Sequence, residues 1–116
     1  MRFIFCLAAV LAFVSSPALS AAEWYEGGTL QKGAVSDWTS ATPEDQLATS
    51  ADFIASLSGV KDVAEVKDAR ALADIKKRSE DLKICIDDLI AKGDLAQDKR
   101  IAELVILCTI LKKTGE

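Results

Sequence analysis

The chain has 116 residues and is acidic, with 14 Lys and Arg against 18 Asp and Glu, and it contains no His. Its hydrophobic fraction of 50% excludes an intrinsically disordered chain, and its length suits one small domain with a modest core. An acidic surface of interspersed signs argues against nucleic acid and anionic lipid as partners.

The first twenty residues have the pattern of a cleaved signal peptide. Met1 and Arg2 form a short positive region, and an unbroken apolar run of twelve residues follows at 3–14, too short to span a bilayer. The small residues after it permit cleavage after Ser20 or after Ala22. An uncleaved N-terminal anchor is the disfavoured alternative. We therefore expect an exported protein, periplasmic or secreted, with no stable membrane insertion after cleavage.

Cleavage changes both the charge and the cysteine count of the mature chain. Arg2 is lost, so 13 basic residues face 18 acidic ones and the net charge becomes −5. Cys6 is lost as well, which leaves Cys85 and Cys108 as an even pair in an oxidising compartment. We predict a disulfide, worth roughly 3 kcal/mol by the loop-closure model. A buried pair of thiols and a redox site are the alternatives, although no CxxC spacing is present.

The segment 21–41 is predicted to be an N-terminal arm with a short helix near residues 34–40. It holds Trp24, Tyr25 and Trp38, three of the four aromatic residues of the mature chain, and Phe53 is the fourth. Clustered aromatic residues are typical of a recognition surface, which makes these three the candidate binding residues. The favoured interpretation is that they fold back to cap the helical domain, because a small core benefits from large side chains.

A helix is predicted to start after Thr42, which can cap it. Pro43 suits the first helical position, and Asp45 completes a pattern like a capping box. Gly59 is expected to end the helix in a left-handed conformation. The residues at helical spacing that mark its buried face are Leu47, Ala51, Ile54 and Leu57, with Phe53 beside them.

A second helix is predicted to open at Asp62, with Glu65 as its capping partner, and to stop at Gly93. Its length for so small a domain indicates a break before Leu72 or near Ser79. The buried seam follows a spacing of three and four residues, as in a coiled coil. Its members are Leu72, Ile75, Ser79, Leu82, Ile86 and Leu89.

The last helix is predicted to be the central and most buried one, because apolar residues cover most of its circumference. Either Asp94 or Asp98 can cap it. If this helix starts near Lys99, Cys108 lies about 13 Å along it from the turn, and Cys85 lies about 10 Å from the turn along the preceding helix. These similar distances would bring the two sulfurs together in an antiparallel hairpin. We therefore expect a loop over residues 93–97. The apolar residues are Ile101, Leu104, Val105, Ile106, Leu107, Ile110 and Leu111.

The sequence as a whole predicts an all-α domain over residues 42–116, a bundle of three to four helices closed by one disulfide. The lack of His removes the usual general base and the commonest metal ligand. Asp87 and Asp88 point about 100° apart on a helix, and Asp94 with Asp98 lacks the spacing of a calcium loop. We expect no enzyme activity, no cofactor and no metal site.

Four segments stand out together: residues 27–30 followed by Trp38, residues 47–53, Cys85-Ile86-Asp87, and the late Cys108. In these segments the chain resembles a family of small exported bacterial helical proteins that has no assigned activity. A fainter similarity is to periplasmic acid-stress chaperones of the HdeA type, through the Trp38-Thr39 stretch, export and a single disulfide. In that family the first cysteine falls near the Trp, whereas this chain has Ser40 there.

The sequence leaves three classes of function, of which the first two are the expectations. The leading one is a small binding or accessory protein that acts through contacts with a protein partner, and a homodimer is compatible with it. The alternative is an acid-activated holdase chaperone, because eighteen carboxylates turn the charge strongly positive below about pH 3. A small enzyme with a paired carboxylate cleft is the third class.

Overall fold

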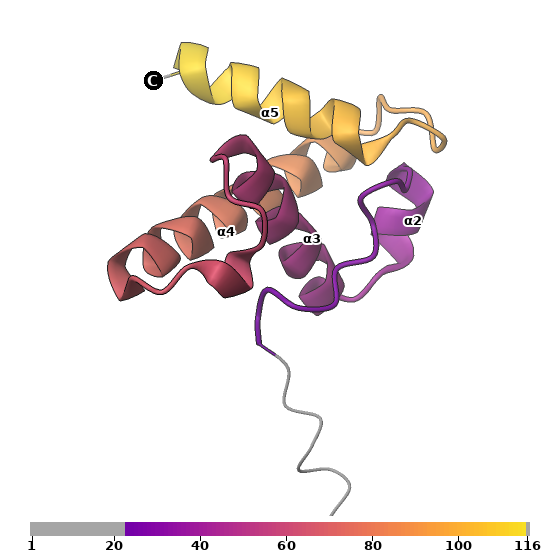
Figure 1. The fold of residues 1–116 in the computed structure, drawn as a ribbon. Helices are drawn as coiled ribbons and strands as arrows, with labels where there is room; N and C mark the ends of the chain where they lie inside the picture. The colour runs from indigo at the N-terminus through magenta and orange to yellow at the C-terminus, as the bar shows by residue number, and fades with distance from the viewer. Residues whose placement is uncertain (1–22, 116) are drawn as a thin grey trace, which may run out of the picture.

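The computed structural model describes residues 23–115, and the predicted signal peptide lies outside the described residues. Four α-helices are present in this part of the chain. Helices α3 (Pro43–Leu57) and α4 (Ala69–Ala91) pack against each other, α2 (Val35–Ser40) lies beside α3, and α5 (Ile101–Gly115) lies across the top (Figure 1). The predicted all-α fold is confirmed.

Helix α2 is short and is anchored by its two large apolar residues. It begins one residue later than predicted, and the Asp37 carboxylate accepts a hydrogen bond of 2.8 Å from the backbone N–H of Ala34 at its start. Val35 and Trp38 are both 1% exposed. A helix of six residues is unstable alone, so burial of these side chains holds it in place.

Helix α3 starts and ends where the sequence predicts. The Thr42 hydroxyl accepts the N–H of Asp45 at 3.1 Å, and Pro43 occupies the first turn. The Asp45 carboxylate does not complete a capping box, because it accepts hydrogen bonds from Thr29 instead. Gly59 follows the helix with φ of +78°, as expected for a left-handed C-terminal residue.

The predicted helix from Asp62 is interrupted before Leu72, as its length indicates. Asp62 caps a short 3-10 helix, η2 (Val63–Glu65), and Asp68 caps α4 through the N–H of Arg70. Helix α4 continues through Ser79, whose hydroxyl donates to the carbonyl of Ile75 at 2.7 Å. The buried residues of the seam are Ile75, Ser79, Leu82 and Ile86, and Leu72 and Leu89 are partly buried.

Helix α5 is peripheral, and the prediction that it is the most buried helix is wrong. Only one stripe of it faces the core, made up of Ile101, Leu104, Val105 and Cys108. A domain of this size has too few helices to surround a fourth on all sides. The remaining large apolar residues of α5, Ile106, Leu107, Ile110 and Leu111, are therefore left exposed.

The start of α5 is set by contacts with the segment before α2. Ala34 and Arg100 form an isolated antiparallel bridge, and the N–H of Ile101 donates to the carbonyl of Gly33 at 2.9 Å. The predicted start near Lys99 is thus two residues early, and neither Asp94 nor Asp98 is the residue before the helix. The non-helical connection runs on past the predicted loop of 93–97 to this bridge.

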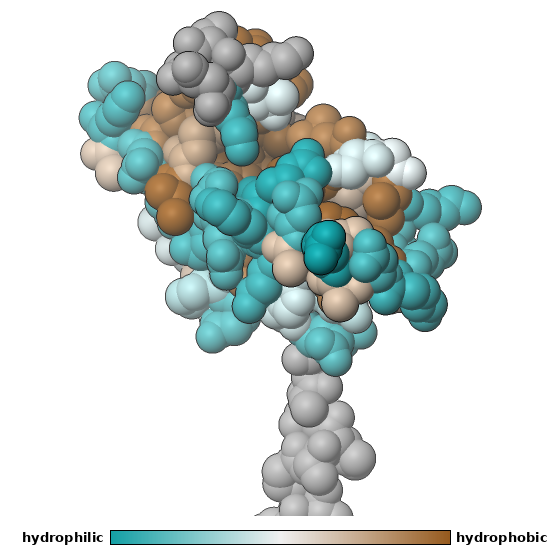
Figure 2. Space-filling view, turned by 90° about the vertical axis from the view of Figure 1, so that its left-hand side faces the viewer, coloured by the Kyte–Doolittle hydropathy of each residue, from teal (hydrophilic) through white to brown (hydrophobic). Residues whose placement is uncertain are grey.

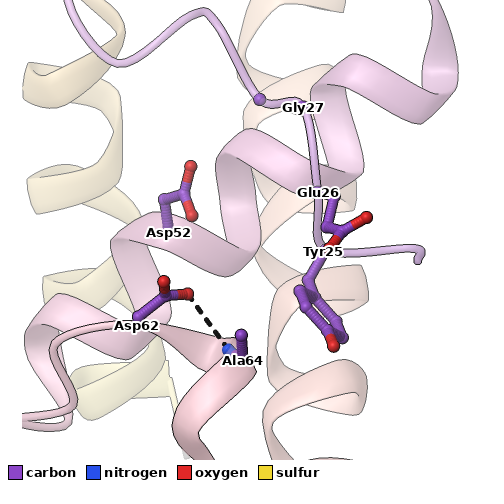
Figure 3. Close-up of a pocket in the computed structure, with 7 residues that line it drawn as sticks. Tyr25, Glu26, Gly27, Asp52, Asp62 and Ala64 are labelled. Carbon is purple, nitrogen blue, oxygen red and sulfur yellow. Dashed lines mark hydrogen bonds between the residues drawn. The ribbon is translucent and has the colours of Figure 1, made fainter. Parts of the chain in front are cut away.

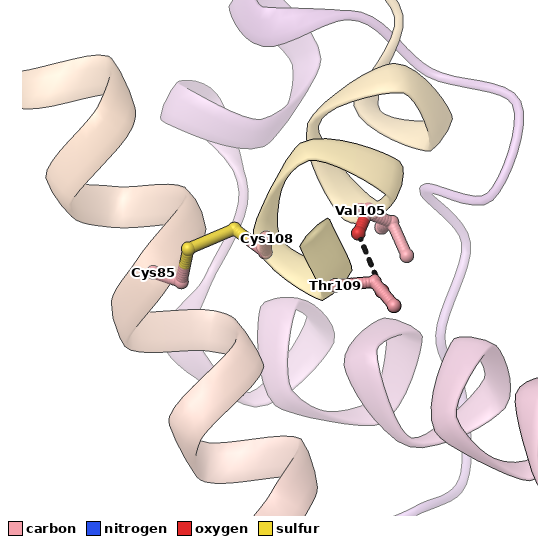
Figure 4. The surroundings of a disulfide bond; sticks show 4 residues. All are labelled: Cys85, Val105, Cys108 and Thr109. Atoms are coloured by element: carbon pink, nitrogen blue, oxygen red, sulfur yellow. Dashed lines mark hydrogen bonds between the residues drawn. A yellow bond between two sulfur atoms is a disulfide. The ribbon is translucent and has the colours of Figure 1, made fainter. Parts of the chain in front are cut away.

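The predicted disulfide joins α4 to α5. The Cα atoms of Cys85 and Cys108 are 6.1 Å apart, and the bond closes the two helices over each other (Figure 4). The helices cross instead of running side by side as an antiparallel hairpin (Figures 1 and 4). The expected start was therefore nearly right, although the hairpin geometry used to derive it was not.

Candidate binding surfaces

The segment just before α2 is held on α3 by that helix's polar side chains. Thr29 donates to Asp45 twice, from its N–H at 2.8 Å and from its hydroxyl at 2.6 Å. The N–H of Leu30 donates to the Thr49 hydroxyl at 3.2 Å. A Cβ atom on Gly28 would lie 2.6 Å from the backbone nitrogen of Thr49, so only glycine permits this approach.

These contacts make Asp45 a stronger acid than usual. Burial by itself would raise the pKa of Asp45, but hydrogen bonds from the hydroxyl and N–H of Thr29 and from the Thr49 hydroxyl outweigh it and lower the pKa. A lowered pKa in the folded state stabilises the fold above the unfolded value, near 3.9, and this contribution is lost as the pH falls through the folded value.

Trp38, one of the three candidate binding residues, lies in the core. It is 1% exposed, and its indole N–H donates to the Asp87 carboxylate at 2.8 Å. Lys83 donates to the other oxygen of Asp87 at 2.9 Å. Trp38 therefore contacts α4 in the interior, in line with the favoured interpretation, and is separate from any exposed aromatic surface.

Trp24 and Tyr25 stay partly exposed at the edge of the core. Their rings meet edge to face with centroids 5.3 Å apart, and the Lys76 ammonium lies 5.8 Å from the Trp24 centroid. Both residues pack against the buried cluster. The three candidate residues therefore form two separate sites, and only this pair reaches the surface.

A shallow acidic pocket of about 260 Å³ lies beside Tyr25, with Glu26, Asp52 and Asp62 around it (Figure 3). Burial raises the pKa of Asp52 in spite of a hydrogen bond from Gln31, and the Asp62 charge adds to the rise. Desolvation and the neighbouring carboxylates also raise the pKa of Tyr25. Asp62 already accepts the N–H of Ala64 at 3.0 Å.

Residues 23–115 show neither a cluster of metal-ligating side chains nor a membrane-spanning helix. No group of three or more His, Cys, Asp or Glu side chains in this range is arranged to hold a metal ion. None of the helices described is long and apolar enough to cross a membrane.

The outer face of α5 is an exposed apolar part of the described surface. The outer face consists of Ile106, Leu107 and Ile110, which are 59%, 39% and 51% exposed. In the view of Figure 2, hydrophobic residues gather toward the top, where α5 lies, and hydrophilic residues cover most of the rest. Contiguous apolar surface of this kind marks interaction sites.

An apolar groove of about 960 Å³ lies on the other side of α5, under its C-terminal half. The floor is formed by Ile54 and Leu57 of α3, Leu82 of α4 and Leu111 of α5, together with the disulfide. Figure 4 shows the disulfide spanning α4 and α5 at this crossing.

The rim of the groove carries three charged side chains, Arg78, Asp81 and Lys112. Asp81 is paired with Lys77 at 3.2 Å, and Arg78 lies 3.6 Å from Asp74. Lys112 forms no ion pair with any described residue. The rim is therefore locally basic on an acidic protein.

Comparisons of the chain with protein-family models, with curated proteins and with solved structures gave no match. The candidate surfaces therefore rest on geometry alone.

Sequence reasoning missed both the outer face and the groove. It treated the apolar residues of α5 as one buried set, whereas the structure divides them between core, groove and solvent. One signal was available in the sequence. The sequence predicts only three long helices, and two of them cannot surround the third on all sides. An excess of apolar residues around one helix therefore indicates that some of them are exposed.

Proposed function

We propose that this protein is a small exported binding protein that acts through protein contacts, with the outer face of α5 as its contact surface. The observation that carries the proposal is the exposure of Ile106, Leu107 and Ile110 on one helix. Burying each such side chain fully stabilises a complex by about 1.5–3 kcal/mol, and these are already partly buried, so the gain is smaller.

The expected partner contributes an apolar helix face. Ile106 and Ile110 are four residues apart and Leu107 lies between them, the spacing that one helix offers to the ridges of another. An amphipathic helix of a partner protein fits a surface of this shape better than an extended strand, because the described residues present no sheet edge for strand addition.

The test uses the mature chain, from Ala21, with its disulfide formed. We expect the double variant Ile106→Gln and Ile110→Gln to keep its far-UV circular dichroism and melting temperature while losing a stoichiometric partner captured from the native compartment. Leu57→Gln is the matched control, since Leu57 is 56% exposed but lies in the groove. Equal loss of the partner in both variants, or loss in neither, would contradict the proposal.

Light scattering of the purified mature chain decides whether the partner is a second copy. A dimer that becomes a monomer in the Ile106 and Ile110 variant would assign the outer face to self-association. A monomer in both forms, with the captured protein still lost in the variant, would assign it to a different protein.

The second candidate function is the acid-activated holdase, and the attachment of Thr29 to Asp45 is the observation that favours it. Protonation of Asp45 removes the charge that accepts two hydrogen bonds from Thr29. Acid would thereby loosen residues 28–31 from α3 and expose Leu30, which is buried in the fold. Asp52 acts in the opposite sense, since a raised pKa favours the folded state at low pH.

This candidate is tested by the aggregation of a model client protein as the pH is lowered to about 2, below the carboxylate pKa values. Asp45→Asn should shift the onset of protection to higher pH, whereas Asp88→Asn, at an exposed carboxylate of α4, should not. Absence of protection at every pH would end this candidate.

A further inference from the structure

We propose that the groove under α5 binds a long-chain carboxylate of the fatty-acid class, with the hydrocarbon tail on the groove floor and the carboxylate at Lys112. This site is separate from the outer face of α5, so the proposal stands or falls independently of the protein-contact function.

The floor is suited to a hydrocarbon chain. Ile54 and Leu82 are 6% and 7% exposed and form a closed base, while Leu57 and Leu111 are about half exposed on the two sides. A tail lying between them would cover the exposed parts of Leu57 and Leu111. The volume of about 960 Å³ lies at the upper end of the range for small-molecule sites.

The disulfide keeps the groove from closing or opening. Cys85 and Cys108 line it, and their bond ties α5 to α4 at the crossing point. The buried residues of α5 are Ile101, Leu104, Val105 and Cys108, so this bond is the last core contact before the C-terminal half of the helix. A preformed groove binds a flexible chain at a lower ordering cost than one that must assemble.

The charge at the rim favours an anionic head group over a neutral or cationic one. Asp81 is neutralised by Lys77, and Arg78 is shared between Asp74 and the Ser58 hydroxyl. Lys112 has no such partner among the described residues. The negative end of the α5 dipole lies in the same turn, so the Lys112 ammonium group, and not the helix end, has to supply the contact.

The experiment is calorimetric titration of the mature, disulfide-bonded protein with dodecanoate and dodecyltrimethylammonium below their micelle concentrations and with dodecanol below its solubility limit. We expect saturable binding of one dodecanoate and at least tenfold weaker binding of the cation. Lys112→Glu should weaken dodecanoate binding about fivefold to tenfold, because it replaces an attraction by a repulsion. Lys67→Glu, the same charge change outside the groove lining, should leave it unchanged.

Two further variants separate this site from the outer face. Leu57→Gln should weaken all three ligands that reach the floor, whereas Ile106→Gln should affect none of them. Equal binding of the anion and the cation would overturn the proposal, as would equal effects of the Lys112 and Lys67 variants. Absence of saturable dodecanoate binding would overturn it as well. A groove that binds an apolar peptide but not dodecanoate would count as this outcome.

Discussion

Replacing Trp38 with Phe tests whether this residue belongs to the core or to a recognition surface. The change removes the indole N–H that donates to Asp87 at 2.8 Å, and it shrinks a side chain that is 1% exposed. A hydrogen bond to a charged group contributes about 1.5–3 kcal/mol, and the low end applies because the Asp87 side chain is 41% exposed. The void left by the smaller ring adds about 1 kcal/mol.

The expected loss is therefore about 2–3 kcal/mol of unfolding free energy, or a fall of roughly 10–20 °C in melting temperature for a domain of this size. Thermal unfolding followed by far-UV circular dichroism measures it without relying on the lost fluorophore. Trp24→Phe is the matched comparison, since Trp24 is only partly buried and donates no described hydrogen bond through its indole. A Trp38→Phe loss no larger than that of Trp24→Phe would refute the reasoning.

Three other changes should also be visible in unfolding experiments. Gly28→Ala should lower the free energy of unfolding by about 2 kcal/mol or more, because the new Cβ would lie 2.6 Å from the α3 backbone. Gly27→Ala should lower it by only about 1 kcal/mol, because the space around Gly27 is open and only its φ of +88° causes strain. Reduction of Cys85–Cys108 should remove roughly 3 kcal/mol, measured as a fall in melting temperature with dithiothreitol, and an unchanged temperature would mean that the bridge does not form. Asp45→Asn should lower the free energy of unfolding by about 1 kcal/mol at neutral pH. Below about pH 4 the variant should lose less stability than the wild type, as measured by urea unfolding at a series of pH values. An equal loss of stability in both proteins as the pH falls would contradict this role of Asp45.

The helix boundaries that depend on local chemistry could be predicted from the sequence. Thr42 with Pro43 marks a start because a hydroxyl cap and a preset φ act within one turn. Gly59 and Gly93 mark stops because both adopt positive φ, at +78° and +79°. The seam of α4 follows from periodicity alone, and even its break could be anticipated from the length of the segment.

Boundaries that depend on distant partners could not be predicted. Helix α5 begins at Ile101 because the carbonyl of Gly33 accepts its first N–H, a contact across 68 residues of chain. The carboxylate of Asp45 was expected to cap its own helix, but Thr29 provides two donors and takes it. Local patterns show which groups need hydrogen bonds, and only the folded chain shows which groups supply them.

The candidate surfaces show the same division. The sequence identified the aromatic residues, yet their sites differ because Trp38 meets Asp87 across the core while Trp24 and Tyr25 remain at its edge. The outer face and the groove depend on how α5 crosses α4, and no local signal encodes that crossing.

By itself, the sequence determined the helical class, the pairing of Cys85 with Cys108 and the most reliable helix ends, because each rests on residue chemistry or on counting. Only the tertiary structure decided which side of α5 is buried. The same apolar residue stabilises a core, lines a groove or faces solvent according to what lies beside it, and that depends on packing among all the helices at once.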